Sequence, residues 1–319
     1  MTLHINHLAA AAALALSLAP QAHADSIFAA PYEVHSIGGQ AVMMTGGDGT
    51  LTYSSGIDFN GTDPNTLGAL VGALNVGRIE VHGVGGVSID RNYTNDEFDE
   101  PIRTELKART QVSGYTVDTT TGQILGVSSA GGLEHRGTRI SGTLTGGVAT
   151  VSNLRFDLQN NIVYADLQGT KGPVGTRPAV NYSLPNTALW TIDSVSGPTV
   201  IDPAALALQG QARLDAFVAQ GFTHTSANGY DVLSATQVIS GLRATTQGFN
   251  FFRDSLGLLS TGVGALSAVY ADPQGWGSFT STLTFAIPVP EASTYAMMAA
   301  GMLVIGSALH LRRSAAAAR

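Results

Sequence analysis

The alternation of hydrophobic and polar positions predicts that most of this chain forms β-strands. Within residues 139–167, small or apolar residues recur at every second position over 140–144 and again over 154–158. A period of two is typical of a strand with one buried face. The segments "TGG" and "QNN" that follow these two runs are predicted turns, so the stretch is typical of a β-meander. Similar alternation occurs in residues 77–90 and 278–287.

Three segments show the spacing of helices instead: residues 63–75, 202–222 and 248–260. The first two begin with Asp-Pro, which predicts an N-cap followed by proline at the first helical position. Leu214, Phe217 and Val218 form the predicted buried stripe of the second helix. We therefore expect a mainly β fold, with antiparallel sheets arranged like a β-sandwich and two or three short helices packed on them.

Residues 172–203 contain five prolines and are predicted to form a long connection around one core strand. The connection indicates a soft domain boundary near residue 195, within a body that spans residues 25–287. The related segments "VYADLQG" (163–169) and "VYADPQG" (269–275) lie on either side of it. They indicate either a structural repeat or two similar strand-to-turn endings that arose independently.

The amino terminus resembles a secretory signal peptide over residues 1–24. Its apolar run, residues 8–18, is too short to span a bilayer, which takes roughly 20 residues. The run leads to Ala22-His23-Ala24, which fits the small-x-small pattern that signal peptidase cleaves. We expect a signal helix that is cut between Ala24 and Asp25, so that the chain is exported.

Composition agrees with an exported, folded body. The chain has a net charge of −7, which gives it no electrostatic reason to bind nucleic acid. It contains no cysteine, so disulfides and thiolate metal sites are excluded. With 44 % hydrophobic residues among its 319, it can bury a core and does not have the composition of a disordered chain.

Sequence motifs give little indication of catalysis. The chain lacks a nucleophile elbow, a zinc-protease helix, a Walker loop and a dinucleotide fingerprint. The four histidines of the body are isolated in sequence and are interpreted as ordinary surface residues: His35, His82, His135 and His224. No cofactor is expected from these features.

The acidic stretch "DRNYTNDEFDE" (90–100) offers hard oxygen ligands of the kind that Ca²⁺ prefers. Its candidate ligands are Asp90, Asn92, Asp96 and Asp99. The spacing departs from an EF-hand loop, and a solvated acidic loop is the alternative.

A secreted carbohydrate-active hydrolase would need two facing carboxylates in a cleft, and usually aromatic side chains that stack on the sugar. The candidate carboxylates are Glu80, Glu97, Glu105 and Glu134, and the two tryptophans are Trp190 and Trp276.

The carboxyl end, residues 288–319, has a distinctive order of parts. Val289, Pro290 and Glu291 precede an apolar run over 296–311, which is followed by Arg312 and Arg313. At 1.5 Å per residue the run would be about 24 Å long, shorter than the roughly 30 Å hydrocarbon core of a bilayer. This order resembles the PEP-CTERM sorting signal of exported proteins of Gram-negative bacteria, although Ala292 stands where that motif has a second proline.

The resemblance implies a transmembrane helix that holds the chain in the inner membrane, with the arginine pair on the cytoplasmic side. An exosortase would then cleave near Pro290 and Glu291 and release the protein to the cell surface, often together with extracellular polysaccharide. A plain membrane anchor that is never cut is the alternative. The expected function is a non-enzymatic role at the cell surface or in the extracellular matrix. A carbohydrate-active hydrolase and a ligand-binding surface module remain the alternatives.

Mass spectrometry of the exported protein tests both processing sites. We expect the mature chain to begin at Asp25 and to end near Pro290, because both terminal segments are interpreted as removable signals. An exported form that still carries Arg319 would contradict cleavage of the tail.

Overall fold

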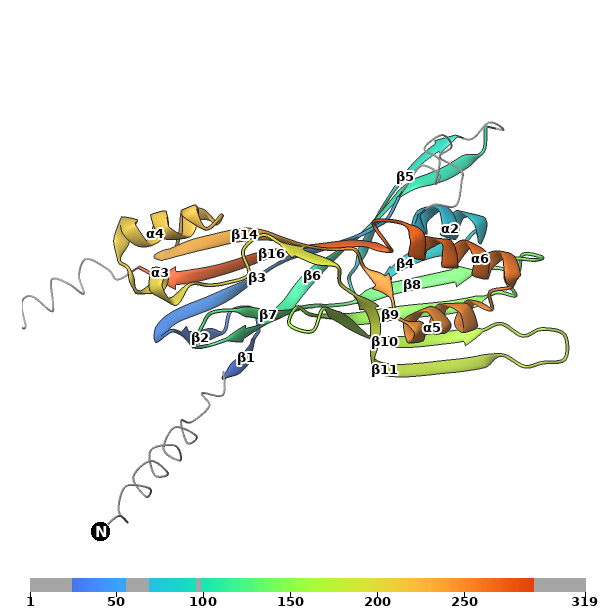
Figure 1. Cartoon of the computed structure of the whole chain (residues 1–319), viewed down its shortest axis with the longest axis horizontal. Coiled ribbons are helices and arrows are strands. Elements are labelled where there is room, and N and C mark those ends of the chain that lie inside the picture. Colours follow the sequence, from blue (N-terminus) through green and yellow to red (C-terminus); the bar gives the residue numbers. More distant parts are fainter. Residues whose placement is uncertain (1–24, 56–68, 96–98, 290–319) are drawn as a thin grey trace, which may run out of the picture.

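In the computed structural model, which describes residues 25–55, 69–95 and 99–289, the chain is built mainly from antiparallel strands (Figure 1). This confirms the predicted mainly β, antiparallel class. The amino-terminal half contributes nine strands: β1 (Ser26–Ala29), β2 (Val34–Ile37), β3 (Gln40–Tyr53), β4 (Glu80–Val84), β5 (Ser88–Asn95), β6 (Pro101–Asp118), β7 (Ile124–Ser129), β8 (Gly132–Gly137) and β9 (Gly147–Asp157).

The carboxyl-terminal half contributes seven more strands: β10 (Ile162–Lys171), β11 (Val180–Thr191), β12 (Ser194–Ser196), β13 (Thr223–Ala227), β14 (Tyr230–Ser240), β15 (Arg243–Ala244) and β16 (Gly277–Pro288). Neighbouring strands follow the path β12-β14-β16-β3-β6-β7-β9-β10-β11-β15. The shorter strands β1, β2, β5, β8 and β13 pair with members of this path, and β4 pairs with β8.

A short ladder joins the two ends of this path. β12 continues β11 beyond Asp193, and β15 continues β14 beyond Gly241. Thr191 pairs with Arg243 and Ser194 with Ser240, so the last strands of the path are hydrogen-bonded to the first. The bend at Gly241 has φ +67°, and an added Cβ would lie 2.5 Å from the side chain of Asp193. The sheet therefore continues through residue 195 and closes on itself there.

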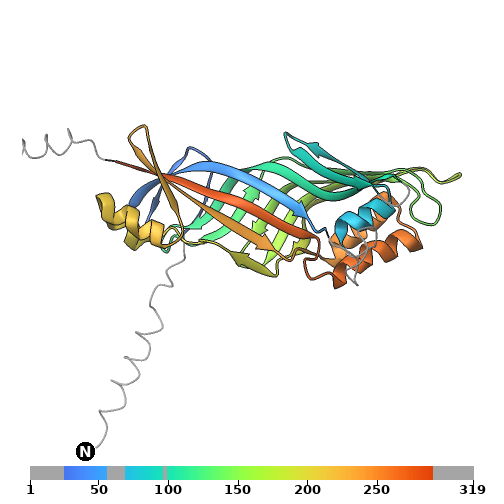
Figure 2. The ribbon, with the colours of Figure 1, turned by 90° about the horizontal axis from the view of Figure 1, so that it is seen from above.

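The helices gather at the two ends of an elongated molecule, as both views show (Figures 1 and 2). One end carries α3 (Pro203–Ala207) and α4 (Gly210–Ala219), and the other carries α2 (Leu70–Val76), α5 (Thr246–Leu256) and α6 (Ser260–Ala268). A 3₁₀ turn, Val269–Ala271, follows α6. α5 packs on β9, β10 and β11, and α2 packs on β6 and α6.

The alternation read from the sequence places the core on the inner face of the sheet. In β16, Phe279, Leu283 and Phe285 are fully buried and alternate with partly exposed residues. Phe279 stacks on Phe156 of β9, with ring centroids 4.2 Å apart. Phe285 meets Phe217 of α4, with centroids 5.4 Å apart, and so anchors that helix to the sheet.

Several local predictions were wrong. Residues 140–144 form a tight turn with Gly142 at φ +77°, although their alternation predicts a strand. The predicted helix over 202–222 is two helices, α3 and α4, and Val218 is 53 % exposed instead of buried. The helix α6 was not predicted, so that the described residues contain five helices.

The two similar segments have different structures. Residues 163–169 lie within β10, whereas residues 269–275 form the 3₁₀ turn and the bend after it. The Asp-Pro step at Asp272 ends the second segment as a turn, since proline lacks the N–H that a central strand needs. The match is therefore not a structural repeat.

The predicted signal helix (1–24) and the predicted apolar helix (296–311) lie outside the described residues. Among the residues that are described, no helix combines the length and the apolar character that crossing a membrane requires.

Candidate functional site

An apolar cavity lies beneath α2, α5 and α6 at one end of the molecule. Its walls include Leu70 and Leu74 from α2, Phe252 from α5, Leu266 from α6, and Trp276, which precedes β16. All five side chains are at most 7 % exposed. The cavity measures about 20 Å³ in this packing, which leaves room for roughly one water-sized group.

A hydrogen-bonded tyrosine–histidine pair borders this cavity. Tyr53 ends β3 and His135 lies on β8, and the Tyr53 Oη atom is 2.7 Å from His135 Nε2. The His135 ring lines the cavity and meets Phe252 edge-on, with centroids 5.1 Å apart. Two titratable groups are thus held together in apolar surroundings, where burial is costly unless the groups are paired.

The hydrogen bonds fix the tautomer of His135. Its Nδ1 atom lies 3.2 Å from the carbonyl oxygen of Ala149, which can only accept, so Nδ1 carries the proton. Nε2 therefore accepts a hydrogen bond from the Tyr53 hydroxyl. Burial lowers the pKa of His135 from 6.5 to about 4 and raises the pKa of Tyr53 above its ordinary value. Both groups are neutral near pH 7.

Arg103 of β6 adds a buried positive charge beside the pair. Its side chain donates from Nη2 to the carbonyl oxygen of Ile79 at 2.9 Å and from Nε to Asn75 Oδ1 at 3.3 Å. Nη1 has no hydrogen-bond partner among the described residues. The guanidinium charge opposes protonation of His135 and favours the anionic form of Tyr53. Burial outweighs the charge of Arg103, so Tyr53 is held as a neutral phenol.

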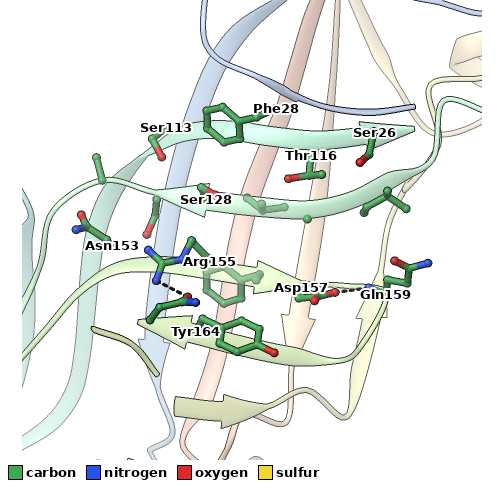
Figure 3. A pocket seen from close by; sticks show the side chains of 17 residues that line it. Ser26, Phe28, Ser113, Thr116, Ser128, Asn153, Arg155, Asp157, Gln159 and Tyr164 are labelled. Carbon is green, nitrogen blue, oxygen red and sulfur yellow. Dashed lines mark hydrogen bonds between the residues drawn. The ribbon is translucent and has the colours of Figure 1, made fainter. Parts of the chain in front are cut away.

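A second hollow, an open groove of about 640 Å³, lies on the outer face of the sheet (Figure 3). It crosses β1, β6, β7, β9 and β10. Phe28 and Tyr164 contribute aromatic rings to it, and Arg155 and Asp157 contribute charges (Figure 3). Ser26, Ser113, Thr116 and Ser128 add hydroxyl groups.

The predicted calcium ligands are engaged with protein partners where they are described. Asp90 forms an ion pair with Arg109, Asn92 donates to Glu105, and Asp99 accepts from Asn95 at 2.7 Å. Asp96 lies outside the described residues. Within the described part of the chain, no group of three or more Asp, Glu or His side chains is arranged to hold a metal ion.

The candidate residues of a hydrolase are dispersed. Glu105 pairs with Lys107 and Glu134 with Arg136, while Glu80 lies on β4 opposite Arg136, and Glu97 lies outside the described residues. Trp190 and Trp276 are each 3 % exposed, and their rings lie 6.2 Å apart in the core. They therefore pack the interior and do not line a sugar cleft.

One arrangement at the other end of the molecule has the residue types of a catalytic triad but not its geometry. His224 Nε2 lies 3.0 Å from Asp231 Oδ1 and 3.3 Å from Ser226 Oγ. A triad needs the carboxylate and the hydroxyl on opposite ring nitrogens. Arg213 also donates to Asp231 at 3.3 Å, so the cluster joins α4 to β14.

The processing residues lie at the limits of the described chain. Asp25 is exposed, and its carbonyl oxygen accepts from the Thr119 backbone N–H at 3.1 Å and the Thr119 hydroxyl at 2.8 Å. Val289 is 42 % exposed, and its N–H donates to the carbonyl oxygen of Gly229 at 2.9 Å. The other predicted processing residues lie outside the described residues: Ala24, Pro290, Glu291, Arg312 and Arg313.

Sequence reasoning missed the tyrosine–histidine pair. His135 was interpreted as a surface residue, yet it is 4 % exposed. The alternation in "GLEHRG" places Leu133 and His135 on the same face of β8, and this was the available signal. The partner, Tyr53, is separated from it by 82 positions and could not be identified by spacing.

Comparisons with known proteins add little to this description. No protein-family model matches the chain, and no curated protein sequence matches it. Among solved structures, it is similar to the heme binding protein HtaB from Corynebacterium glutamicum, with 16 % sequence identity and a TM-score of 0.30. The likeness covers 76 % of this chain and 96 % of that one. At this TM-score it assigns neither a family nor a function to the chain.

The low pKa of His135 predicts a loss of stability in mild acid. Its pKa is 6.5 when unfolded and about 4 when folded, so below pH 6.5 the unfolded chain binds the proton more readily. Unfolding in urea should show roughly 2–3 kcal/mol less stability at pH 4.5 than at pH 7 from this group.

The variant His135→Gln is the matched control, because it cannot titrate. It should be less stable at pH 7 but should lose less stability on acidification than the natural protein. Equal acid losses in both proteins would show that His135 is not buried in its neutral form. The carboxylates of Asp118 and Asp166 do not account for this window, since hydrogen bonds lower their pKa values below 3.8.

Proposed function

We propose that this chain is an exported, non-enzymatic surface protein that binds a ligand in the apolar cavity beneath α2, α5 and α6. The observation that carries the proposal is the hydrogen bond from Tyr53 to His135, the histidine that lines that apolar wall. Ligand sites are typically apolar hollows with a small number of placed polar groups. A buried phenol with a proton acceptor on its oxygen is such a group.

The chemistry of the pair favours a ligand that combines a flat apolar body with an electron-poor atom. Ferric haem has both properties, and tyrosine is one of the side chains that hold haem iron in proteins. Tyr53 would supply the phenolate oxygen, which the positive charge of Arg103 would favour, and its proton would leave to solvent because burial and Arg103 keep His135 neutral. The aromatic and aliphatic walls would cover the apolar macrocycle.

The donor groups fit haem, whereas the volume of the closed cavity does not. A cavity of about 20 Å³ is far below the roughly 300 Å³ or more of a typical ligand pocket. Binding therefore requires α2 and α6 to separate from α5. Neither helix is capped by the side chain of its own N-cap residue, although the Ser54 hydroxyl accepts from the N–H of Leu70 in α2, and α6 contains Gly262 and Gly264. Short helices of this kind open at low free-energy cost.

The proposed location follows from the terminal segments. The leader and the PEP-CTERM-like tail would carry the body across the inner membrane and release it at the cell surface. Association with extracellular polysaccharide would then retain it there. A ligand-binding body in that place would meet its ligand outside the cell.

Titration of the purified exported protein with hemin tests the ligand proposal. We expect saturable binding with the absorption bands of ferric haem coordinated by tyrosinate. Tyr53→Phe should weaken binding at least tenfold and abolish those bands, because it removes the proposed ligand oxygen. Tyr115→Phe is the matched control. It alters another buried phenol, which donates to the carbonyl oxygen of Thr282 at 2.6 Å, and should bind as the natural protein does.

Two outcomes would contradict the proposal for haem. One is the absence of saturable binding by the natural protein. The other is binding that Tyr53→Phe and Tyr115→Phe weaken equally, because hemin would then adhere without coordination by Tyr53.

A further inference from the structure

We propose that the groove on the outer face of the sheet is a second binding site, and that it holds a short segment of a neutral glycan chain. The groove residues serve no evident purpose in the core, and the cavity lies on the other side of the sheet. In β9, Arg155 and Asp157 line the groove, whereas Phe156 between them packs inward on Phe279. The groove therefore uses the outward face of β9, and its strands supply none of the side chains that line the cavity.

Strand register places the groove residues in two rows across the sheet. In the first row Phe28 pairs with Thr116, Thr116 with Gly126, and Gly126 with Asp157. In the second row Gly114 pairs with Ser128, Ser128 with Arg155, and Arg155 with Tyr164. Directly paired residues point to the same face of a sheet. These rows form the floor of the groove.

Two of the paired residues in these rows are glycines, Gly114 and Gly126. A Cβ on Gly114 would lie 2.4 Å from the Phe28 ring, so this ring lies directly over the glycine. A Cβ on Gly126 would project beside the Thr116 side chain, at 3.6 Å from its hydroxyl oxygen. Neither glycine has a positive φ, so backbone strain does not require them. Gly114 instead gives room to the Phe28 ring, and Gly126 lets β7 lie close to β9, since a Cβ there would be 2.9 Å from the Phe156 carbonyl oxygen.

Hydroxyl groups that make no hydrogen bond within the described part of the protein line the groove. The side-chain hydroxyls of Ser26, Ser113, Thr116, Ser128 and Tyr164 have no hydrogen bond to any described residue, and all five residues line the groove. Each hydroxyl can both donate and accept. Sugar hydroxyls have the same dual capacity, so a sugar can pair with these groups whichever way each one turns.

The charged residues of the groove are already fixed in position. Arg155 Nη2 donates to Asn186 Oδ1 at 2.9 Å and to Asp166 Oδ1 at 3.2 Å. Asp157 Oδ1 accepts from the backbone N–H groups of Gln159 and Asn160 at 3.1 and 2.9 Å. Prearranged polar groups lose little entropy when a ligand binds.

The charge balance favours a neutral glycan over an anionic one. The single positive charge of Arg155 is matched by Asp166, and Asp157 adds a negative charge. The chain as a whole carries a net charge of −7. An anionic polymer would therefore be repelled, whereas a neutral one would not.

The aromatic rings stand at the two ends of the floor. Phe28 on β1 is 51 % exposed, and Tyr164 lies on β10, four strand spacings away. At about 4.8 Å per spacing the rings are roughly 19 Å apart along the sheet. Each ring offers an apolar face to the C–H face of a sugar. A segment of a few sugar rings would span the distance.

Affinity electrophoresis tests the inference with gels that contain soluble dextran, mannan, xylan or mixed-linkage β-glucan. We expect at least one of these neutral polysaccharides to retard the exported protein. Tyr164→Ala should weaken that retardation at least fivefold, because it removes a stacking ring that makes no hydrogen bond. Ser128→Tyr should weaken it similarly by filling the floor. Thermal unfolding of each variant confirms that it is folded.

Tyr93→Ala is the matched control, since Tyr93 is 55 % exposed on β5 and does not line the groove. It should be retarded as the natural protein is. No retardation in any gel, or equal retardation of all the variants, would overturn the inference. Hemin binding should be unchanged by Tyr164→Ala and Ser128→Tyr, so failure of the groove proposal is distinguishable from failure of the cavity proposal.

Discussion

The pairing of β6 with four other strands is the constraint on which both proposed sites depend. Over Pro101–Asp118, β6 pairs with β5 and β3 in its first half and with β1 and β7 in its second. Its first half holds Arg103 beside the cavity. Its second half supplies Ser113 and Thr116 to the groove. A strand anchored on both sides cannot shift by one residue without turning every side chain to the opposite face.

The two sites differ in how their polar groups are stabilised. In the cavity, Tyr53 and His135 depend on each other, because replacing one would leave the Tyr53 hydroxyl or the His135 Nε2 atom buried without a partner. The Ala149 carbonyl oxygen completes this arrangement at His135 Nδ1. In the groove, the hydroxyls are accessible to solvent and need no protein partner. The cavity therefore favours a ligand that coordinates the buried phenol oxygen. The groove favours a ligand that displaces water from its hydroxyl groups.

How much could be predicted from the sequence depended on whether a feature was local. Alternation correctly predicted strands over 154–158 and 278–287, because each has one face in the core. It failed over 140–144, where Gly142 adopts a positive φ that alternation does not reveal. Helical spacing failed at Val218, since α4 meets the sheet mainly through Phe217 and leaves its neighbour in solvent.

The candidate sites were not predictable in the same way. Tyr53 and His135 meet only because β3 and β8 converge at the end of the sheet that α2, α5 and α6 cover. The groove depends on the register of five strands, which brings Phe28 and Tyr164 to one face. The acidic stretch near Asp90 was the most visible polar cluster in the sequence. In the structure Asp90 and Asn92 pair with neighbouring strand β6 instead of converging on one point.

The central claim is that a ligand enters the apolar cavity by separating α2 and α6 from α5. Hydrogen–deuterium exchange of the exported protein, measured with and without hemin, tests it most directly. We expect hemin to change the exchange of α2, α6 and β8, while α3 and α4 at the opposite end exchange as before. Unchanged exchange in α2 and α6 at saturating hemin would contradict it.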